Sequence, residues 1–366
     1  MKNIHTFPNF LFDNTSSFLS FFKNHKKILL IHSNNLVTSK LFELIKDKIS
    51  KNIKFYNISK NKMSINKGFY NKLNNKVKFD LVLSIGGGSA IDIGKIFYAK
   101  ILNENFLYSK KTRTNTLFKK NDIDFAALVT LPGSGAETSK TSIININKKK
   151  KFFISRNFVP KYIAYDFDTI SNNSSEQQIF RVIDSMIHGI ESNETILSST
   201  FSNYLSQNIV IKSKKILKEI LKNKNSKLKI SIVKEICATS FYGGLAQSEC
   251  GSSLCHAIAH YIENNFKLNH SESIFLATFI KLSYEKKMKH KSQLFKCEKL
   301  LKYIYFDFLK DEERTHYDRI INKISLTKFL KTIKEDPCFK LTKKHVDINK
   351  LKYVMSSIKK KRRWNI

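Results

Sequence analysis

Histidine is scarce in this chain, yet four of its 10 histidines fall in two short segments, DSMIHGIES and LCHAIAHYIENNFKLNH. Asp184 precedes His188 by four residues, and His256 precedes His260 by the same interval. Residues four apart share one face of a helix, so the members of each pair can reach a common ion. His270 follows NNFKLN, which suits a turn between two helices. One carboxylate with several imidazoles favours a divalent transition metal such as Fe(II) or Zn(II) over Mg²⁺ or Ca²⁺.

Each of these histidines has a simpler reading when it is taken alone. A single histidine on an apolar helix face is more often a core residue with satisfied hydrogen bonds, or a cation near a helix end. The two DxxxH and HxxxH pairs favour a metal centre only because they occur together.

Glycine is also scarce, with 11 residues, yet three stand together in IGGGSAIDIGK. Glycines between a buried strand and a helix let a pyrophosphate approach the backbone and the free N–H groups of the helix N-terminus. A second turn, LPGSGAETSK, also follows a strand. Either loop alone could be a plain tight turn, and Asp92 with Lys95 could be a surface ion pair. Together the two loops favour a nucleotide site.

These residues need particular elements to position them. Short apolar runs separated by amphipathic segments predict parallel strands buried on both faces. The expected strands are residues 27–33, 52–59, 79–89, 125–131 and 162–168. After the polar segment SNNSSEQQ the strands stop and helical spacing takes over, with Ser174 or Ser175 as the first helix cap. The chain is therefore predicted to have an α/β domain over residues 1–173 and an all-α domain over 174–366.

The net charge, the cysteines and the apolar runs narrow the partners and the cellular location that can be expected for this protein. The formal net charge of +35 raises nucleic acid or an anionic membrane surface as partners. However, the basic residues are dispersed and no nucleic-acid motif accompanies them, so solvated lysine-rich faces explain the charge better. Five cysteines without a CxxC pair suit a reducing cytoplasm. Neither a signal peptide nor an apolar run of membrane-spanning length is apparent, so a cytoplasmic protein is expected.

The order GGGSxxDxxK, GSGAE, DxxxHxxE, HxxxH and a further histidine resembles the iron-containing (group III) alcohol dehydrogenase family, relatives of glycerol dehydrogenase and dehydroquinate synthase. The resemblance covers roughly residues 25–275. It implies a Rossmann-like domain followed by an all-helical domain, with the active site in the cleft between them. The metal ligands that it implies are Asp184, His188, His256 and His270, and His260 would lie beside the substrate as a proton relay.

The same resemblance implies a site for NAD or NADP. The glycine turn, with Ser89, would hold the pyrophosphate, and the second loop would face the nicotinamide and ribose. The expected cofactor-binding residues are Ser33, Gly86, Gly87, Gly88, Ser89, Asp92, Thr130, Ser134, Thr138 and Lys151. Many NAD-dependent members carry an aspartate after the first strand, where this chain has Ser33. Loss of that negative charge accommodates the 2′-phosphate of NADPH.

Two other departures alter the sites without removing a ligand. The family's PTTAGTGSE is VTLPGSGAE here, which brings Pro132 into the cofactor loop. Its HGxxN after the last ligand is HSESI, with no glycine at position 271.

The resemblance implies a metal-dependent alcohol dehydrogenase or aldehyde reductase that works as a homodimer. The basic composition suggests an anionic substrate, such as a sugar acid or a phosphonate aldehyde. A dehydroquinate-synthase-like lyase is disfavoured because that group binds metal with a glutamate and two histidines. A glycerol-phosphate dehydrogenase relative stays open. So does a protein that binds nucleic acid or an anionic surface on an enzyme fold; steeply salt-dependent affinity would identify it.

Overall fold

The computed structural model describes residues 10–12, 14–33, 40–49, 53–58, 65–73, 79–102, 113–114, 123–146, 149–224, 226–290, 292–342 and 346–361. The chain divides into two compact units, Met1–Ser171 and Asn172–Ile366. Within the described residues, no helix has both the length and the apolar character needed to cross a membrane.

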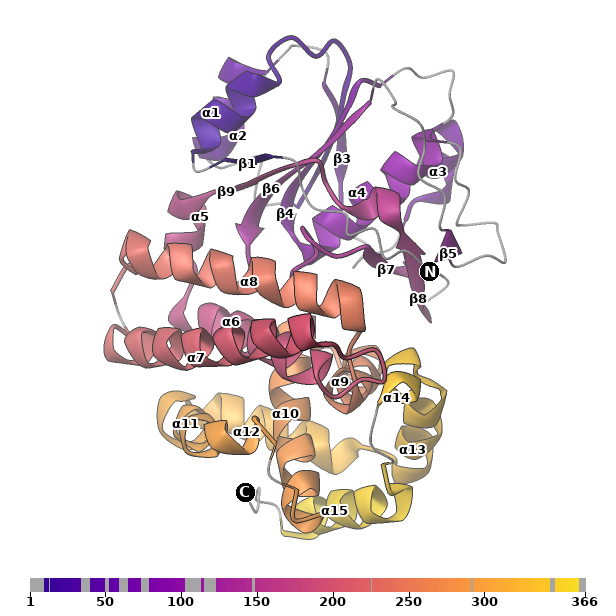
Figure 1. Ribbon diagram of the computed structural model, residues 1–366, viewed down its shortest axis with the longest axis vertical. Coiled ribbons are helices and arrows are strands. Elements are labelled where there is room, and N and C mark those ends of the chain that lie inside the picture. Colours follow the sequence, from indigo (N-terminus) through magenta and orange to yellow (C-terminus); the bar gives the residue numbers. More distant parts are fainter. Residues whose placement is uncertain are drawn as a thin grey trace. The chain divides into compact units, whose positions relative to one another are not determined.

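A six-stranded, wholly parallel sheet forms the centre of the first unit (Figure 1). Its order is β1-β9-β6-β4-β2-β3. The strands are β1 (Phe10–Phe12), β2 (Ile28–His32), β3 (Ile53–Asn57), β4 (Leu81–Gly87), β6 (Asp124–Leu131) and β9 (Tyr162–Tyr165). The five strands expected from apolar runs are confirmed. The short edge strand β1 was not predicted, because three residues give no usable period.

Helices cover both faces of this sheet, as a doubly wound fold requires. The helices of this unit are α1 (Thr15–Phe21), α2 (Lys40–Lys48), α3 (Lys67–Lys72), α4 (Gly88–Ile101) and α5 (Phe167–Ser171). Alternate residues of β2 show the two faces. Leu30 packs with α1 and α2, whereas Leu29 packs with α3 and α4. Burial on both sides explains why these strands have continuous apolar sequences.

A small second sheet, of order β5-β8-β7, packs beside α4. Its strands are β5 (Arg113–Thr114), β7 (Thr141–Ile146) and β8 (Lys149–Ser155). The antiparallel β7–β8 pair was not predicted, because the lysine run KKKK in its sequence resembles a solvated loop. Phe153 and Ile144 from these strands nevertheless reach the same core as α4.

The second unit is helical throughout its described residues, apart from one isolated bridge between Thr195 and Thr342. Its helices are α6 (Ser175–Ser192), α7 (Thr200–Lys222), α8 (Ile230–Cys250), α9 (Leu254–Asn265), α10 (His270–Lys287), α11 (Glu298–Tyr303), α12 (Asp311–Lys323), α13 (Leu326–Glu335), α14 (Pro337–Leu341) and α15 (Ile348–Lys361). Helices α6, α7 and α8 lie side by side (Figure 1). The predicted cap is confirmed: the Ser174 side chain accepts a hydrogen bond from the backbone N–H of Gln177.

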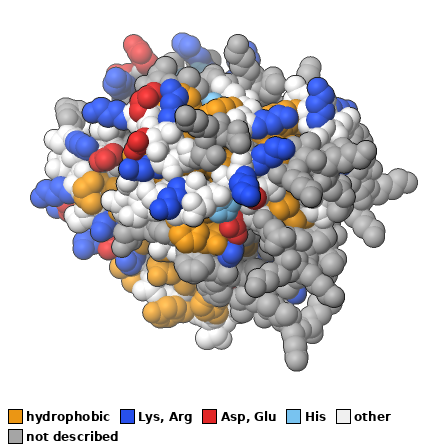
Figure 2. Space-filling model, turned by 90° about the horizontal axis from the view of Figure 1, so that it is seen from above, with side chains coloured by type: hydrophobic (Ala, Val, Ile, Leu, Met, Phe, Trp, Pro, Cys, Tyr) orange, Lys and Arg blue, Asp and Glu red, His pale blue; other side chains and the backbone are white. Residues whose placement is uncertain are grey.

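One face of the molecule carries its described basic residues in a dispersed pattern (Figure 2). On the face seen in Figure 2, Lys and Arg side chains are spread among other types, with Asp and Glu between them. A nucleic-acid interface requires a continuous basic patch or stripe. This face therefore agrees with the solvated-lysine explanation of the charge.

Candidate metal and nucleotide sites

Three helices of the second unit bring the predicted metal ligands together. Asp184 and His188 lie one turn apart on α6, His256 lies in α9, and His270 is the first residue of α10. From Asp184 Oδ1, the distance to Nε2 is 3.7 Å for His188 and 3.9 Å for both His256 and His270. Asp184, His188 and His256 are almost completely buried.

The donor atoms have the character of a metal site. Asp184 Oδ1 and His256 Nε2 are buried, and within the described part of the chain neither makes a hydrogen bond. Such atoms cost free energy unless a ligand satisfies them. One donor atom each from Asp184, His256 and His270 lies within 4.8 Å of the other two. Ligands about 2.1 Å from a tetrahedral ion stand roughly 3.4 Å apart, so this set needs only a small contraction to bind one ion.

Burial keeps His188 in the form that binds metal. Burial lowers the pKa of His188 to about 3, against the opposing effect of Asp184. The ring is therefore neutral at physiological pH, and a neutral imidazole nitrogen is the ligand that a transition metal requires. Fe(II) and Zn(II) both suit one carboxylate with three imidazoles.

A second layer of side chains orients these ligands. His256 Nδ1 donates to Glu191 Oε2 at 2.6 Å, and His270 Nδ1 donates to Glu263 Oε2 at 3.1 Å. Ser271 Oγ donates to Asp184 Oδ2 at 3.2 Å, which leaves Oδ1 to face the imidazoles. Carboxylates bound to the outer ring nitrogen fix the tautomer, so that the inner nitrogen presents its lone pair.

Glu191 is the most heavily bonded of these groups. Besides His256, it accepts from Ser253 N and Oγ at 2.9 and 2.8 Å and from Cys255 N at 2.5 Å. Burial alone would raise the pKa of Glu191, but the hydrogen bond from His256 and the charge of Lys281 bring it well below its usual value. Glu191 is therefore a carboxylate that anchors the start of α9 to α6.

His260 lies next to the metal ligands and has its own partner. Its ring stacks on that of His270 with centroids 6.0 Å apart, and its Nδ1 donates to Asp336 Oδ2 at 3.0 Å. Asp336 is the N-cap of α14, and its Oδ1 accepts from Cys338 N at 2.8 Å. Burial opposes ionisation, yet the neighbouring His260 holds the pKa of Asp336 below its usual value. This carboxylate fixes the orientation of the His260 ring.

In the first unit, the two glycine loops lie against each other at the ends of β4 and β6. Gly87 pairs with Leu131 across these strands, and α4 begins at Gly88 without a side-chain cap. A Cβ atom added at Gly88 would lie 2.6 Å from Ser134 Oγ, so no larger residue fits there unless Ser134 moves. Gly135 has φ +62°, a conformation that favours glycine. The loops thus form a close-packed cradle at a helix N-terminus, which suits a phosphate.

Asp92 and Lys95 lie inside this unit, so the alternative of a surface ion pair is wrong: the two residues form a buried ion pair. Lys95 Nζ lies 3.0 Å from Asp92 Oδ1 and donates to Thr141 O at 2.6 Å, while Asp92 Oδ2 accepts from Ile143 N at 3.0 Å. Lys95 is fully buried. The pair therefore links α4 to β7 by hydrogen bonds in the interior of the unit.

The other predicted cofactor residues occupy separate elements of the same unit. Ser33 directly follows β2 and is half-buried, and its backbone oxygen accepts from His32 Nδ1 at 2.8 Å. Thr130 lies near the end of β6, while Thr138 is buried in the turn that follows. Ser89 lies in the first turn of α4, and Lys151 is exposed on β8.

Sequence reasoning missed the residues behind the ligands. Glu191 stands one turn beyond His188 in the quoted DxxxHxxE motif, so helical spacing alone could have identified it. Glu263 follows His256 by seven residues, which is two turns of a helix, so helical spacing could also have identified it. No such spacing points to Asp336, because four whole helices, α10 to α13, separate it from His260 in the chain.

Family models match both units of the chain. The model of iron-containing alcohol dehydrogenases matches residues 10–167, and the model of the C-terminal part of the Fe-containing alcohol dehydrogenase family matches residues 179–333. Among curated relatives, long-chain-alcohol dehydrogenase 1 of Geobacillus thermodenitrificans is 24% identical over 199 residues, which is 54% of this chain and 49% of the relative. The 4-hydroxybutyrate dehydrogenase of Clostridium kluyveri is 24% identical over 216 residues, or 57% and 56% of the two chains. The chain thus spans about half the length of the curated relatives it matches.

Solved structures share the whole fold at low identity. The structure of sulfoacetaldehyde reductase from Bifidobacterium kashiwanohense in complex with NAD+ superimposes with a TM-score of 0.76 and 13% identity, covering 98% of this chain and 99% of that one. The iron containing alcohol dehydrogenase from Thermococcus thioreducens gives a TM-score of 0.71 and 16% identity, with coverage of 96% and 97%.

Proposed function

Because the chain belongs to the iron-containing alcohol dehydrogenase family, we propose that it is a metal-dependent, NAD-linked alcohol dehydrogenase or aldehyde reductase. The observation that carries this proposal is the placement of Asp184 Oδ1 within 3.7–3.9 Å of three imidazole nitrogens. In such an enzyme the metal supplies Lewis-acid polarisation of the substrate oxygen, and the nicotinamide accepts or delivers hydride. Fe(II) is the expected metal, because the family is iron-containing, with Zn(II) as the alternative.

His260 is proposed to move the proton of the reaction. Asp336 accepts the Nδ1–H, so Nε2 carries the lone pair and can take the proton of a substrate hydroxyl. Stacking of its ring on that of His270 places His260 beside the metal ligands. The Asp336 carboxylate would stabilise the imidazolium while it holds the proton.

The glycine cradle of the first unit is proposed to bind the dinucleotide. Gly86, Gly87, Gly88 and Ser89 would offer backbone N–H groups to the pyrophosphate at the N-terminus of α4. The residues proposed to face the ribose and nicotinamide are Thr130, Ser134, Thr138 and Lys151. Asp92 contributes indirectly, because its carboxylate is engaged by Lys95 and Ile143. With Ser33 after β2, the site would accept NADP as well as NAD.

The substrate is proposed to be a small aldehyde or alcohol with an anionic group. Arg181 lies one turn before Asp184, on the same side of α6, and its Nε is buried without a hydrogen bond to any described residue. Burial lowers the pKa of Arg181, against the opposing charges of Asp184 and Glu272. A carboxylate or sulfonate on the substrate would supply the missing partner. Two of the relatives, a 4-hydroxybutyrate dehydrogenase and a sulfoacetaldehyde reductase, are named for anionic compounds.

The proposal is tested by metal analysis of the Asp184→Ala and His256→Ala variants, alongside His316→Ala, which removes an exposed histidine of α12. The wild type and His316→Ala should hold about one Fe or Zn per chain and oxidise NADH or NADPH with an aldehyde. The two ligand variants should lose both metal and turnover and keep NAD binding. Retention of metal and turnover in either ligand variant would contradict the proposal.

A further inference from the structure

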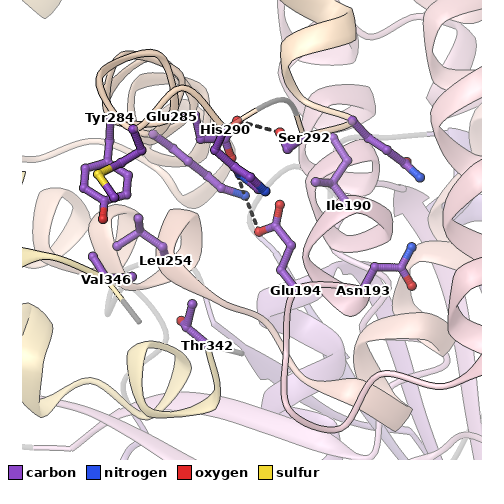
Figure 3. A pocket seen from close by; sticks show the side chains of 13 residues that line it. Ile190, Asn193, Glu194, Leu254, Tyr284, Glu285, His290, Ser292, Thr342 and Val346 are labelled. Carbon is purple, nitrogen blue, oxygen red and sulfur yellow. Dashed lines mark hydrogen bonds and ion pairs between the residues drawn. The ribbon is translucent and has the colours of Figure 1, made fainter. Parts of the chain in front are cut away.

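The helical unit contains a cavity of about 410 Å³ that is separate from the metal ligands (Figure 3). It lies between the end of α6, the start of α9 and the end of α10, and none of the four metal ligands lines it. A volume of this size falls within the range of small-molecule sites and is too large for one or two buried waters.

The walls of the cavity differ in character. Ile190, Leu254, Met288 and Val346 contribute apolar surface. The polar end is formed by a buried lysine, Lys281, together with the carboxylates of Glu194 and Glu285, both of which Figure 3 labels. A ligand that fits would therefore have an apolar body and one charged or polar head.

The charges at the polar end are not balanced. Lys281 Nζ lies 2.5 Å from Glu194 Oε2 and 3.8 Å from both Glu191 Oε1 and Glu285 Oε1. Among the described residues, one ammonium thus faces three carboxylates, and His290 also lines the cavity. Burial raises the pKa of Glu285 to about 7, although Lys281 opposes this, so part of the acid charge is already suppressed. The carboxylates that the structure describes here still outnumber the ammonium, which favours a cation.

The carboxylate oxygens also leave acceptor positions open. Glu194 Oε2 is taken by Lys281 and by Ser253 Oγ, but Oε1 is buried without a hydrogen bond to any described residue. Ser292 Oγ donates to Glu285 Oε2 at 2.5 Å, while Glu285 Oε1 lies 3.8 Å from Lys281 Nζ. A primary ammonium has three donors, so one such group could bond to more than one carboxylate at this end of the cavity.

We propose that this cavity binds a small organic ammonium compound, with its nitrogen at Glu194 and Glu285 and its alkyl part against Leu254 and Met288. The site does not depend on the proposed dehydrogenase activity. It would be a second ligand site of the helical unit.

The test is isothermal titration calorimetry of the full chain at pH 8 with n-hexylammonium, hexanamide and hexanoate. These probes share a chain length and differ in the charge of the head. Hexylammonium should bind with one site per chain, hexanamide at least ten-fold more weakly, and hexanoate without measurable heat. Equal binding of the three probes, or no binding of hexylammonium, would overturn the proposal.

Two variants locate the binding. Glu194→Gln keeps the shape of the side chain and leaves Lys281 with two carboxylates, so the fold should survive; it should weaken hexylammonium at least ten-fold. Met288→Trp, which fills the cavity from the end of α10, should do the same. Glu235→Gln removes a half-exposed carboxylate of α8 paired with Lys212 and serves as the matched control. Unchanged binding in both cavity variants would place the ligand elsewhere and reject the site.

Discussion

Nδ1 of His256 donates a 2.6 Å hydrogen bond to Oε2 of Glu191, a residue seven positions after Asp184 on the same helix. One face of α6 therefore presents Asp184 and His188, two of the proposed metal ligands, and also the carboxylate that orients His256 of α9. The geometry of the metal centre depends on how these two helices are joined.

Replacement of Glu191 by glutamine should weaken metal binding by about 10–100-fold, the range typical of such supporting groups. The amide keeps the size of the side chain but lacks the charge that favours the Nδ1–H tautomer. Competition with a chromophoric chelator would measure the affinity, with Glu235→Gln as the control. An affinity equal to that of the wild type would show that the 2.6 Å bond has no role in holding the ion.

Asp336→Asn should reduce kcat by about 10²-fold or more while the metal stays bound, because the amide no longer stabilises a protonated His260. Steady-state rates from pH 5 to 9 are the measurement. A positioning role predicts that the pH profile of kcat shifts, whereas a purely structural role predicts that only protein stability falls. Asp318→Asn, which removes the charge of an α12 carboxylate that accepts from Tyr305 Oη, tests for a general effect of the substitution.

Gly88→Ala should weaken NAD binding by at least ten-fold, because the added methyl would lie 2.6 Å from Ser134 Oγ and push the two glycine loops apart. The double variant Gly88→Ala, Ser134→Gly removes the clashing atoms and should recover part of the affinity. Gly68→Ala, whose nearest neighbour would be Asn66 Oδ1 at 3.3 Å, is the control. Fluorescence titration with NADH measures the affinity. If Gly88→Ala binds NADH as tightly as the wild type, this loop is not part of the nucleotide site.

Arg181→Gln should raise KM for succinic semialdehyde by about 10–100-fold and leave kinetics with butyraldehyde nearly unchanged, since only the first has a carboxylate to pair. The matched control is Arg314→Gln, which removes an arginine that pairs with Asp311 on α12. A variant that loses activity equally toward both aldehydes would show that Arg181 supports the fold and not the choice of substrate.

Glu176 gives the helical unit a pH-dependent stability. Burial, together with the nearby Glu313 carboxylate, raises the pKa of Glu176 from 4.5 to about 7. The folded state then binds a proton more tightly than the unfolded state, so this group lowers stability as pH rises from about 4.5 to 7. Glu176→Gln should remove that loss. The difference in Tm between variant and wild type should grow from pH 4.5 to pH 7.5; a constant difference would contradict the raised pKa.

Local spacing predicted much of the fold and of the metal site. The i,i+4 relation of Asp184 and His188 fixes their common face on any helix, and the structure brings them to 3.7 Å. The apolar runs predicted β2 and β4 because burial on both faces leaves a continuous signal. The Ser174 cap was readable because its oxygen bonds a backbone group three residues on.

The parts that sequence reasoning missed depend on long-range packing. Asp336 reaches His260 across 76 residues, and Lys281 reaches Glu194 across 87, so no periodicity links either pair. Asp92 and Lys95 are three residues apart on a helix, and this spacing is equally typical of an exposed ion pair. Only the packing of β7 against α4 shows that they are inside.

All four donors at the ion lie between Asp184 and His270, and the glycine loops lie wholly before them in the chain. During synthesis on the ribosome, the parallel sheet therefore emerges with its glycine cradle before the first ligand is made. The full set of proposed ligands is available only after His270 has left the exit tunnel. Availability of iron would then affect the completion of the second unit and leave the folding of the first unaffected.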